Sequence, residues 1–251
     1  MCFDLDSSPP VPTISGAAVS HEDLVLEATD GNRFAAFAAA PDTPSATGVV
    51  ILPDVRGLYR FYEELALRFA ERGVAAIAFD YFGRTAGVGK RDDEFSYREH
   101  VDRTDPATVQ LDVAAAVAWL RDRGVGRVCT VGFCFGGRHS WLSTPGGHDL
   151  AGAVGFYGSL TTRAGRPGPI DRAAELKGPI LALQAGADEN ITAEQNAAFD
   201  EALTAAGVEH EIVTYEGAPH SFFDRSYEEH AEASADAWSR VLDFIAAHAG
   251  S

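Results

Sequence analysis

The residues best suited to chemistry in this chain are the seven from Val131 to Gly137, which read Val-Gly-Phe-Cys-Phe-Gly-Gly. The cysteine, Cys134, lies between glycines two positions before and after it, Gly132 and Gly136. An apolar stretch that favours a strand precedes this run, and small residues that permit a sharp turn into a helix follow it. At such a turn the thiol projects away from the backbone, and the free N–H groups at the start of the helix point toward it. The pattern predicts a nucleophilic cysteine whose thiolate, and the oxyanion of an acyl-transfer intermediate, are stabilised by those groups.

A cysteine nucleophile needs a general base, and the base needs an acid to orient it. Asp188 follows the apolar stretch 179–185, and His220 lies on a long loop after the stretch 209–215. Asp188 would bind one imidazole nitrogen, and the other nitrogen would exchange a proton with Cys134. Each residue alone has an ordinary structural explanation, as a buried thiol, a turn carboxylate or a solvated imidazole. Their order in the chain and their placement after strands predict a triad.

Two further segments follow predicted strands and are expected to reach the same edge of the sheet. Asp54 and Val55 follow the stretch 48–52, where a second N–H group for an oxyanion would come from. Arg84 follows the stretch 74–79, and an arginine there is a candidate anchor for an anionic group of the substrate. A surface ion pair is the alternative explanation for Arg84. The loops 84–104 and 161–170, rich in Arg and Gly, are expected to shape the pocket.

Apolar stretches that favour strands alternate with stretches that favour helices. We predict strands over 24–28, 33–40, 48–52, 74–79, 127–131, 151–157, 179–185 and 209–215, and helices over 60–72, 106–123, 135–143, 192–206 and 226–248. The first two strands form a hairpin, and the last helix begins in a capping box from Ser226 to Glu229. Apolar strands that alternate with helices predict an α/β fold, a mostly parallel sheet with helices on both faces. Ligands of such sheets bind at the carboxyl ends of the strands, which the candidate residues follow.

Length and composition favour one domain over 1–251, of which about 1–20 form an irregular N-terminal segment. The formal charge of −17 argues against nucleic acid or an anionic membrane as a partner. The N-terminus lacks the pattern of a signal peptide, and no apolar run approaches the ~20 residues of a membrane span. Three sparse cysteines favour a reducing compartment, so we expect a cytoplasmic protein. Cys129, inside a predicted strand, is expected to be buried and inert.

The sequence predicts neither a metal nor a cofactor. No spacing of His, Cys and Asp matches a zinc site. The run 83–90 superficially resembles a phosphate-binding loop, but its glycine spacing is wrong and Arg91 stands where Ser or Thr is required. Among the other histidines, His100, His139 and His230 could approach the site, but no partner residue marks any of them.

With these residues in view, the chain resembles the dienelactone hydrolase family, whose members have the α/β-hydrolase fold. The resemblance runs from about Val25 to the C-terminal helix. It rests on the run around Cys134, the Gly-x-Asp turn at 186–188, the Pro-His-Ser-Phe around His220 and the Asp-x-x-x-Arg at 80–84. It implies a triad, an oxyanion hole of two backbone N–H groups and an arginine for a substrate carboxylate. On this chain those roles fall on Cys134, His220 and Asp188, on Val55 and Phe135, and on Arg84.

Two positions differ from the family's pattern. Family members have a Glu just after the early strand, where it pairs with the resting thiol; here Asp54 occupies that position, and we assign it the same thiol-modulating role. They also have a second carboxylate-binding Arg four residues after the histidine. Here Asp224 stands at that position and Arg225 follows it, which makes Arg225 a candidate substrate-binding residue.

These assignments predict a hydrolase of activated carboxylic esters or lactones that works through a thioester acyl-enzyme. A thiolate is expelled easily from a tetrahedral intermediate, so substrates with stabilised leaving groups are favoured. The substrate is expected to be a small molecule that bears a carboxylate, and the protein a monomer or homodimer. Either Asp54 or His220 would take the thiol proton. The alternatives are a non-catalytic small-molecule binder of the same fold and a thiol redox sensor, the latter disfavoured because no second cysteine is positioned to resolve an oxidised Cys134.

Overall fold

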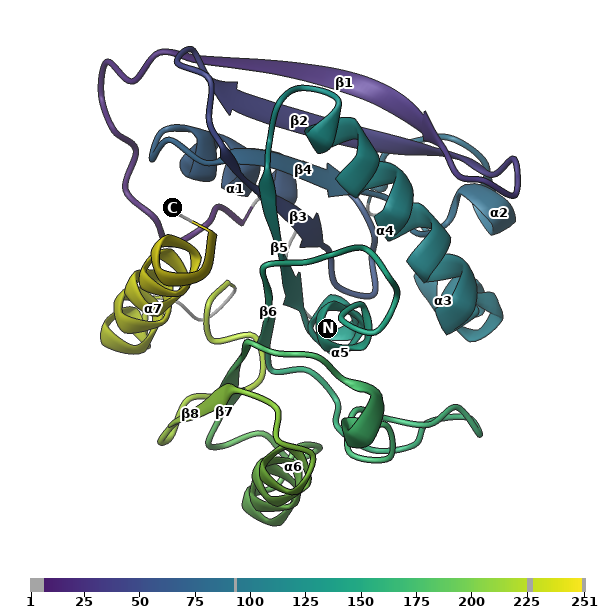
Figure 1. The fold of residues 1–251 in the computed structure, drawn as a ribbon, viewed down its shortest axis with the longest axis vertical. Helices are drawn as coiled ribbons and strands as arrows, with labels where there is room; N and C mark the ends of the chain where they lie inside the picture. The colour runs from purple at the N-terminus through teal and green to yellow at the C-terminus, as the bar shows by residue number, and fades with distance from the viewer. Residues whose placement is uncertain (1–6, 93, 225–227, 250–251) are drawn as a thin grey trace.

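The computed structural model describes residues 7–92, 94–224 and 228–249 (Figure 1). Its strands form one eight-stranded sheet in the order β1-β2-β4-β3-β5-β6-β7-β8. Strand β2 pairs antiparallel with both β1 and β4, and all the other pairs are parallel. The predicted α/β fold with a mostly parallel sheet is confirmed.

The elements fall close to the predicted ranges. The strands are β1 (Val19–Glu27), β2 (Arg33–Pro41), β3 (Thr47–Leu52), β4 (Ala75–Phe79), β5 (Arg127–Phe133), β6 (Gly152–Phe156), β7 (Ile180–Ala185) and β8 (His210–Tyr215). The α-helices are α1 (Arg60–Ala70), α2 (Gly83–Ala86), α3 (Tyr97–Arg103), α4 (Pro106–Arg121), α5 (Phe135–Leu142), α6 (Ala193–Ala205) and α7 (Ala231–Ala249), and a short 3₁₀ turn covers Ala173–Glu175.

Four elements differ from the sequence prediction. Strand β1 begins before residue 24, because it pairs residue for residue with β2 back to Val19, and its exposed polar residues hid this extension. Helix α3 and all but the first residue of α2 lie in the segment 84–104, for which only a loop was expected. The capping box expected at Ser226 lies outside the described residues, and α7 begins at Ala231.

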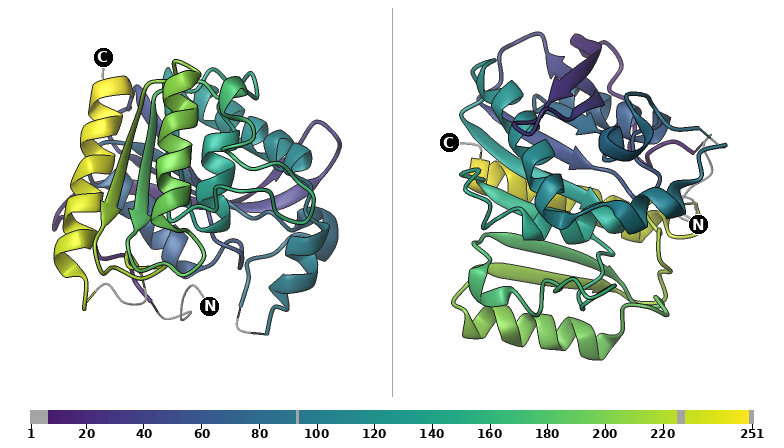
Figure 2. Two further views of the ribbon diagram at one scale, coloured as in Figure 1. Left: turned by 90° about the horizontal axis from the view of Figure 1, so that it is seen from below. Right: turned by 90° about the vertical axis from the view of Figure 1, so that its right-hand side faces the viewer.

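Helices cover both faces of the sheet, as the left view in Figure 2 shows for α7 (yellow) on one face and α5 and α6 on the other. Helices α1 and α4 also lie on opposite faces of the sheet, as the alternating side chains of β3 show. Val49 and Ile51 join the core that contains α1, whereas Val50 and Leu52 join the core that contains α4. A strand buried on both faces has no polar face, which explains why its sequence is a continuous apolar run.

No helix within the described part of the chain has both the length and the apolar character required to cross a membrane.

Candidate active site

Strand β5 brings Cys134 to the turn directly before α5, with backbone angles φ 54° and ψ −109°. A positive φ is uncommon for a residue other than glycine and persists only when the surroundings enforce it. Neither flanking glycine can carry a side chain: a Cβ on Gly132 would overlap the Gly136 carbonyl, and a Cβ on Gly136 would overlap the Leu52 carbonyl. The Cys134 N–H donates to the Phe156 carbonyl at 3.0 Å. The sharp turn predicted from Gly-x-Cys-x-Gly is therefore confirmed.

Asp188 and His220, which are far apart in the sequence, meet after β7 and β8. The Nδ1 atom of His220 lies 2.6 Å from Oδ2 of Asp188, and the second carboxylate oxygen accepts the Asn190 N–H at 2.8 Å. Burial alone would raise the pKa of Asp188, but these hydrogen bonds from His220 and Asn190 lower it overall. An ionised Asp188 keeps the proton on Nδ1 and presents Nε2 as the basic nitrogen. The ring of Tyr157 packs against the imidazole, with 4.9 Å between centroids.

A cavity of about 630 Å³ opens at this edge of the sheet. Its lining includes Cys134 and His220, so the sulfur and the imidazole face one space. It also includes Val55 and Phe135, the two residues expected to supply an oxyanion hole. Phe135 is the first residue of α5, where backbone N–H groups have no partner within the helix. The structure thus gathers four of the predicted site residues around one cavity.

Asp54 is not part of the wall of this cavity. Its carboxylate is fully buried and accepts the Arg56 N–H at 2.7 Å and the Tyr59 hydroxyl at 3.4 Å. Burial raises the pKa of Asp54 to about 7, and the Arg56 N–H and the charge of nearby His220 oppose this rise. Asp54 therefore changes its protonation near neutral pH, which suits a group that exchanges a proton with a thiol.

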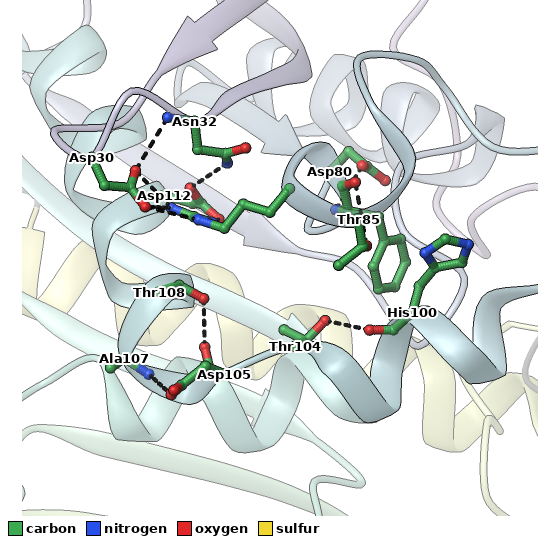
Figure 3. A network of polar contacts seen from close by, with 12 residues as sticks. Asp30, Asn32, Asp80, Thr85, His100, Thr104, Asp105, Ala107, Thr108 and Asp112 are labelled. Atoms are coloured by element: carbon green, nitrogen blue, oxygen red, sulfur yellow. Dashed lines mark hydrogen bonds and ion pairs between the residues drawn. The ribbon is translucent and has the colours of Figure 1, made fainter.

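Arg84 is not where the sequence interpretation put it, because it is absent from the lining of the cavity. Its Nη1 atom donates to the buried carboxylate of Asp112 at 2.6 Å, and Nε and Nη2 donate to Asp30 at 2.9 and 3.0 Å. Figure 3 shows the side chains of Asp30, Asn32 and Asp112 close together, and the Asn32 amide donates a hydrogen bond to Asp112. Two carboxylates occupy the guanidinium, so Arg84 ties the β1–β2 turn to α4 instead of anchoring a substrate.

We expect the variant Arg84→Gln to lose stability rather than substrate affinity. Burial raises the pKa of Asp112 to about 6, so the folded protein binds that proton more tightly than the unfolded chain does. The free energy of unfolding therefore falls as the pH rises from about 4 to about 6. Without Arg84 the ionised carboxylate is buried unpaired, at a cost of about 3 kcal/mol. Urea unfolding should show a larger loss at pH 8 than at pH 5.

The matched control for that experiment is Arg60→Gln, which breaks an exposed pair with Glu64. It should cost less than about 1 kcal/mol, with little difference between the two pH values. Adding Asp112→Asn to Arg84→Gln should restore part of the stability at pH 8, because no buried charge then remains. An equal loss at both pH values in Arg84→Gln would contradict this account of the ion pair.

The second predicted carboxylate-binding residue, Arg225, lies outside the described residues. Its neighbour Asp224 is fully buried, and the hydroxyl of Tyr157 donates to its carboxylate at 3.1 Å. Asp224 thus helps to position Tyr157, the tyrosine whose ring packs against His220.

The remaining sequence expectations have mixed outcomes. Cys129 is fully buried in β5, and burial raises the pKa of its thiol to about 12, so it is inert as predicted. His139 lines the cavity, whereas His100 stacks on Phe95 with 4.8 Å between ring centroids. His230 is not among the residues of the cavity wall. Within the described ranges, no group of three or more His, Cys, Asp and Glu side chains is arranged to bind a metal ion.

For three of the four arginines of the cavity wall, sequence reasoning named only the loop that supplies them, and it did not single out Arg138. Four arginines line the cavity: Arg98 in α3, Arg138 in α5, and Arg163 and Arg166 in the loop 161–170. Many arginines of the chain are exposed, and spacing alone could not tell which of them would turn inward. The arginine-rich composition of 84–104 and 161–170 was the available signal.

A strand-to-helix turn that presents a nucleophile, followed along the chain by an acid and a histidine after later strands, defines the α/β-hydrolase class. This chain has that fold. It belongs to the dienelactone hydrolase family, because the sequence model of that family matches residues 34–249. It is therefore a hydrolase of esters or lactones.

Individual relatives agree with this assignment. "Carboxymethylenebutenolidase" of Rhodococcus opacus is 28% identical over 264 residues, which cover 98% of this chain and 96% of the relative. "Putative carboxymethylenebutenolidase" of Yersinia pestis is 30% identical over 234 residues, which cover 88% of this chain and 86% of the relative. The crystal structure of "Putative Dienelactone Hydrolase" from Klebsiella pneumoniae superposes with a TM-score of 0.81 at 27% identity and covers 91% of this chain and 99% of that one.

Proposed function

We propose that this protein hydrolyses activated carboxylic esters or lactones through a Cys134–His220–Asp188 triad and a thioester acyl-enzyme. The observation that carries the proposal is the 2.6 Å contact of His220 with Asp188, combined with the presence of Cys134 and His220 in one cavity wall. The turn at Cys134 supports it, because the positive φ and the crowded glycines are the local features that expose a nucleophile.

The reaction begins with transfer of the thiol proton to Asp54 or His220. The sulfur of Cys134 attacks the carbonyl carbon, and the N–H groups of Val55 and Phe135 stabilise the oxyanion. Collapse of this intermediate breaks the bond to the leaving oxygen and leaves a thioester. The leaving oxygen takes up the proton that the thiol gave to Asp54 or His220. His220 then accepts a proton from water as the water attacks the thioester, and the acid product departs with the thiol restored.

A thiolate and an alkoxide compete to leave the tetrahedral intermediate. Because the thiolate leaves readily, the tetrahedral intermediate of an ordinary alkyl ester reverts to the substrate more often than it forms the acyl-enzyme. Enol lactones and aryl esters have stabilised leaving groups and avoid this loss. The relatives named carboxymethylenebutenolidase support a lactone as the substrate class. The match with residues 34–249 supports the wider class of ester or lactone hydrolases.

The direct test is to detect the acyl-enzyme. Rapid mixing with p-nitrophenyl acetate, quenching in acid and intact-mass measurement should show an added acetyl group, located by peptide mapping to Cys134. Iodoacetamide should block this acylation in proportion to the labelling of Cys134. Turnover without any acylated Cys134, or turnover that survives complete alkylation of that thiol, would refute the thioester route.

The pH dependence separates the two candidate proton acceptors. Since the pKa of Asp54 is raised to about 7 by burial, kcat/KM should rise through that pH as Asp54 ionises. In the variant Asp54→Asn, this limb should vanish and kcat/KM should fall about 100-fold at pH 8. Profiles measured with one aryl ester from pH 5 to pH 9 provide the check. If the limb stays in Asp54→Asn with little loss of rate, His220 is the acceptor.

A further inference from the structure

A second cavity, of about 530 Å³, lies beside the cavity that contains Cys134. The two cavities share two wall residues, Pro106 and Arg166, and are therefore neighbours. Nothing in the proposed reaction uses the second cavity. Half of the described residues that line it are apolar, namely Pro106, Ala107, Leu142, Pro145 and Pro167.

The polar side chains in the wall of the second cavity have partners within the protein. Arg172 pairs with Glu175 at 2.6 Å, and Asp105 accepts a backbone N–H of α4 at 2.8 Å. The Oε1 atom of Gln110 lies 3.2 Å from Nε2 of His148. The amide nitrogen of Gln110 has no partner among the described residues, but it is buried and contributes almost no exposed surface. What this wall offers to a ligand is therefore mainly apolar surface, which favours an apolar group.

One face of α5 runs along both cavities. Phe135, Arg138 and His139 line the cavity of Cys134, and Leu142, about one turn further along the helix, lines the second cavity. Residues three, four and seven positions apart share one face of a helix. Since a helix rises about 1.5 Å per residue, Leu142 lies about 12 Å along the axis from Cys134. The two cavities together therefore form one groove that begins at the sulfur and follows α5.

Arg138 fixes the loop that supplies another wall of the groove. Its side chain is buried, and its guanidinium donates to the carbonyls of Thr161 at 2.6 Å, Arg166 at 3.1 Å and Pro167 at 2.7 Å. Arg163 and Arg166 also exchange two backbone hydrogen bonds, at 3.1 and 2.9 Å. Because these contacts hold the loop in place, a ligand enters the groove without the entropic cost of ordering this wall.

The place where the two cavities meet also suits an apolar chain. The guanidinium of Arg166 donates to the Asp102 carbonyl at 3.2 Å, which leaves the methylene groups of this side chain to contact a ligand. Pro106, the other shared residue, has no polar side-chain atom. Burial lowers the pKa of His139 to about 3, so its ring is neutral at physiological pH.

We propose that the groove binds esters and lactones whose acyl part carries a long apolar arm, and that the second cavity holds the end of that arm. The inference rests on the proposed function, because it requires the reacting carbonyl to lie at Cys134. The acyl group is the part that becomes bonded to the sulfur, so it starts at the head of the α5 face that leads to the second cavity. A reach of about 12 Å along α5 corresponds to a straight acyl chain of about ten carbons.

The test compares p-nitrophenyl hexanoate, whose acyl chain ends within the cavity of Cys134, with p-nitrophenyl decanoate, whose chain reaches the second cavity. The leaving group is the same in both esters, so a difference in rate reports the arm alone. Each buried methylene group is worth up to about fourfold in affinity, and we expect kcat/KM of the wild type to be at least about tenfold higher for the decanoate ester. Initial rates are measured below the concentration at which this ester forms micelles.

Two variants of α4 locate the effect. Ala107→Asp places a charge in the apolar wall of the second cavity, at the second residue of the helix, where the helix dipole favours an acid. It should reduce the preference for the decanoate ester to about twofold or less. The matched control is Ala118→Asp, at an exposed position of the same helix that belongs to neither cavity wall, and it should keep the preference of the wild type. A wild type without preference, or an unchanged preference in Ala107→Asp, overturns the proposal.

Binding measurements keep this inference separate from the proposed function. Calorimetric titration of Cys134→Ala with hexanoate and with decanoate tests the groove without turnover. Decanoate should bind at least about tenfold more tightly, and adding Ala107→Asp should remove most of that difference. If decanoate binds in this way while the wild type hydrolyses neither ester, the groove stands and the proposed function fails. If both esters are hydrolysed at equal rates and the two acids bind equally, the proposed function stands and the groove is wrong.

Discussion

Replacing Cys134 by alanine is expected to lower the hydrolysis of p-nitrophenyl acetate by about 10⁴-fold or more, because the proposed acyl intermediate forms on its sulfur. The midpoint of thermal unfolding should stay within a few degrees of the wild type, since the thiol is only partly buried and alanine retains the Cβ. Initial rates measured under saturating and subsaturating ester, together with a thermal scan, are sufficient.

The chain supplies its own matched control for that experiment. Cys129 lies five residues earlier, on β5, and is fully buried. Cys129→Ala should cost some stability by opening a small cavity, yet leave kcat/KM within about twofold of the wild type. If Cys134→Ala kept the wild-type rate, the thiol would not be the nucleophile, and the proposed function would lose its central step.

Removing the imidazole should have the second largest effect. We expect His220→Gln to lower kcat/KM by about 10³-fold, because both acylation and deacylation need a proton carrier at the sulfur. Asp188→Asn should cause a similar loss with the ring still present. An amide in place of the carboxylate no longer fixes the proton on Nδ1, so the tautomer that exposes a basic Nε2 is lost.

His210→Gln is the control for His220→Gln. His210 also pairs with a carboxylate, Asp200 at 3.1 Å, but it lies outside the cavity wall. Its replacement should leave the rate unchanged. The double variant Cys134→Ala with His220→Gln should be no slower than Cys134→Ala alone, because the two groups act in one step. Fully additive losses would indicate that they act separately.

The parts of the site that follow from local chain geometry were predictable from the sequence. The pattern Gly-x-Cys-x-Gly after an apolar strand predicts a sharp turn of the backbone, and the structure has that turn at Cys134. Asp188 and His220 were identified for a similar reason, because each comes directly after a strand of a parallel sheet. The carboxyl ends of such strands lie along one edge.

The parts that failed depend on long-range packing. The motif at 80–84 pointed to a substrate contact for Arg84, but Asp30 lies 54 residues earlier and Asp112 28 residues later. Only the folded chain brings these acids together. Arg163 and Arg166 were missed for the same reason, since the loop that carries them is held by the buried side chain of Arg138 on α5 as well as by its own contacts.

That buried side chain has a consequence for any attempt to redesign the enzyme. One guanidinium, that of Arg138, joins α5, the helix that follows Cys134, to the loop 161–170, which contributes to the cavity wall. Altering it would disturb turnover and ligand choice together, so the two properties are not independently adjustable at this position. Directed evolution of the substrate range would do better to begin at Arg163, which is exposed and lines the same cavity, because a change there leaves the hydrogen bonds of Arg138 intact.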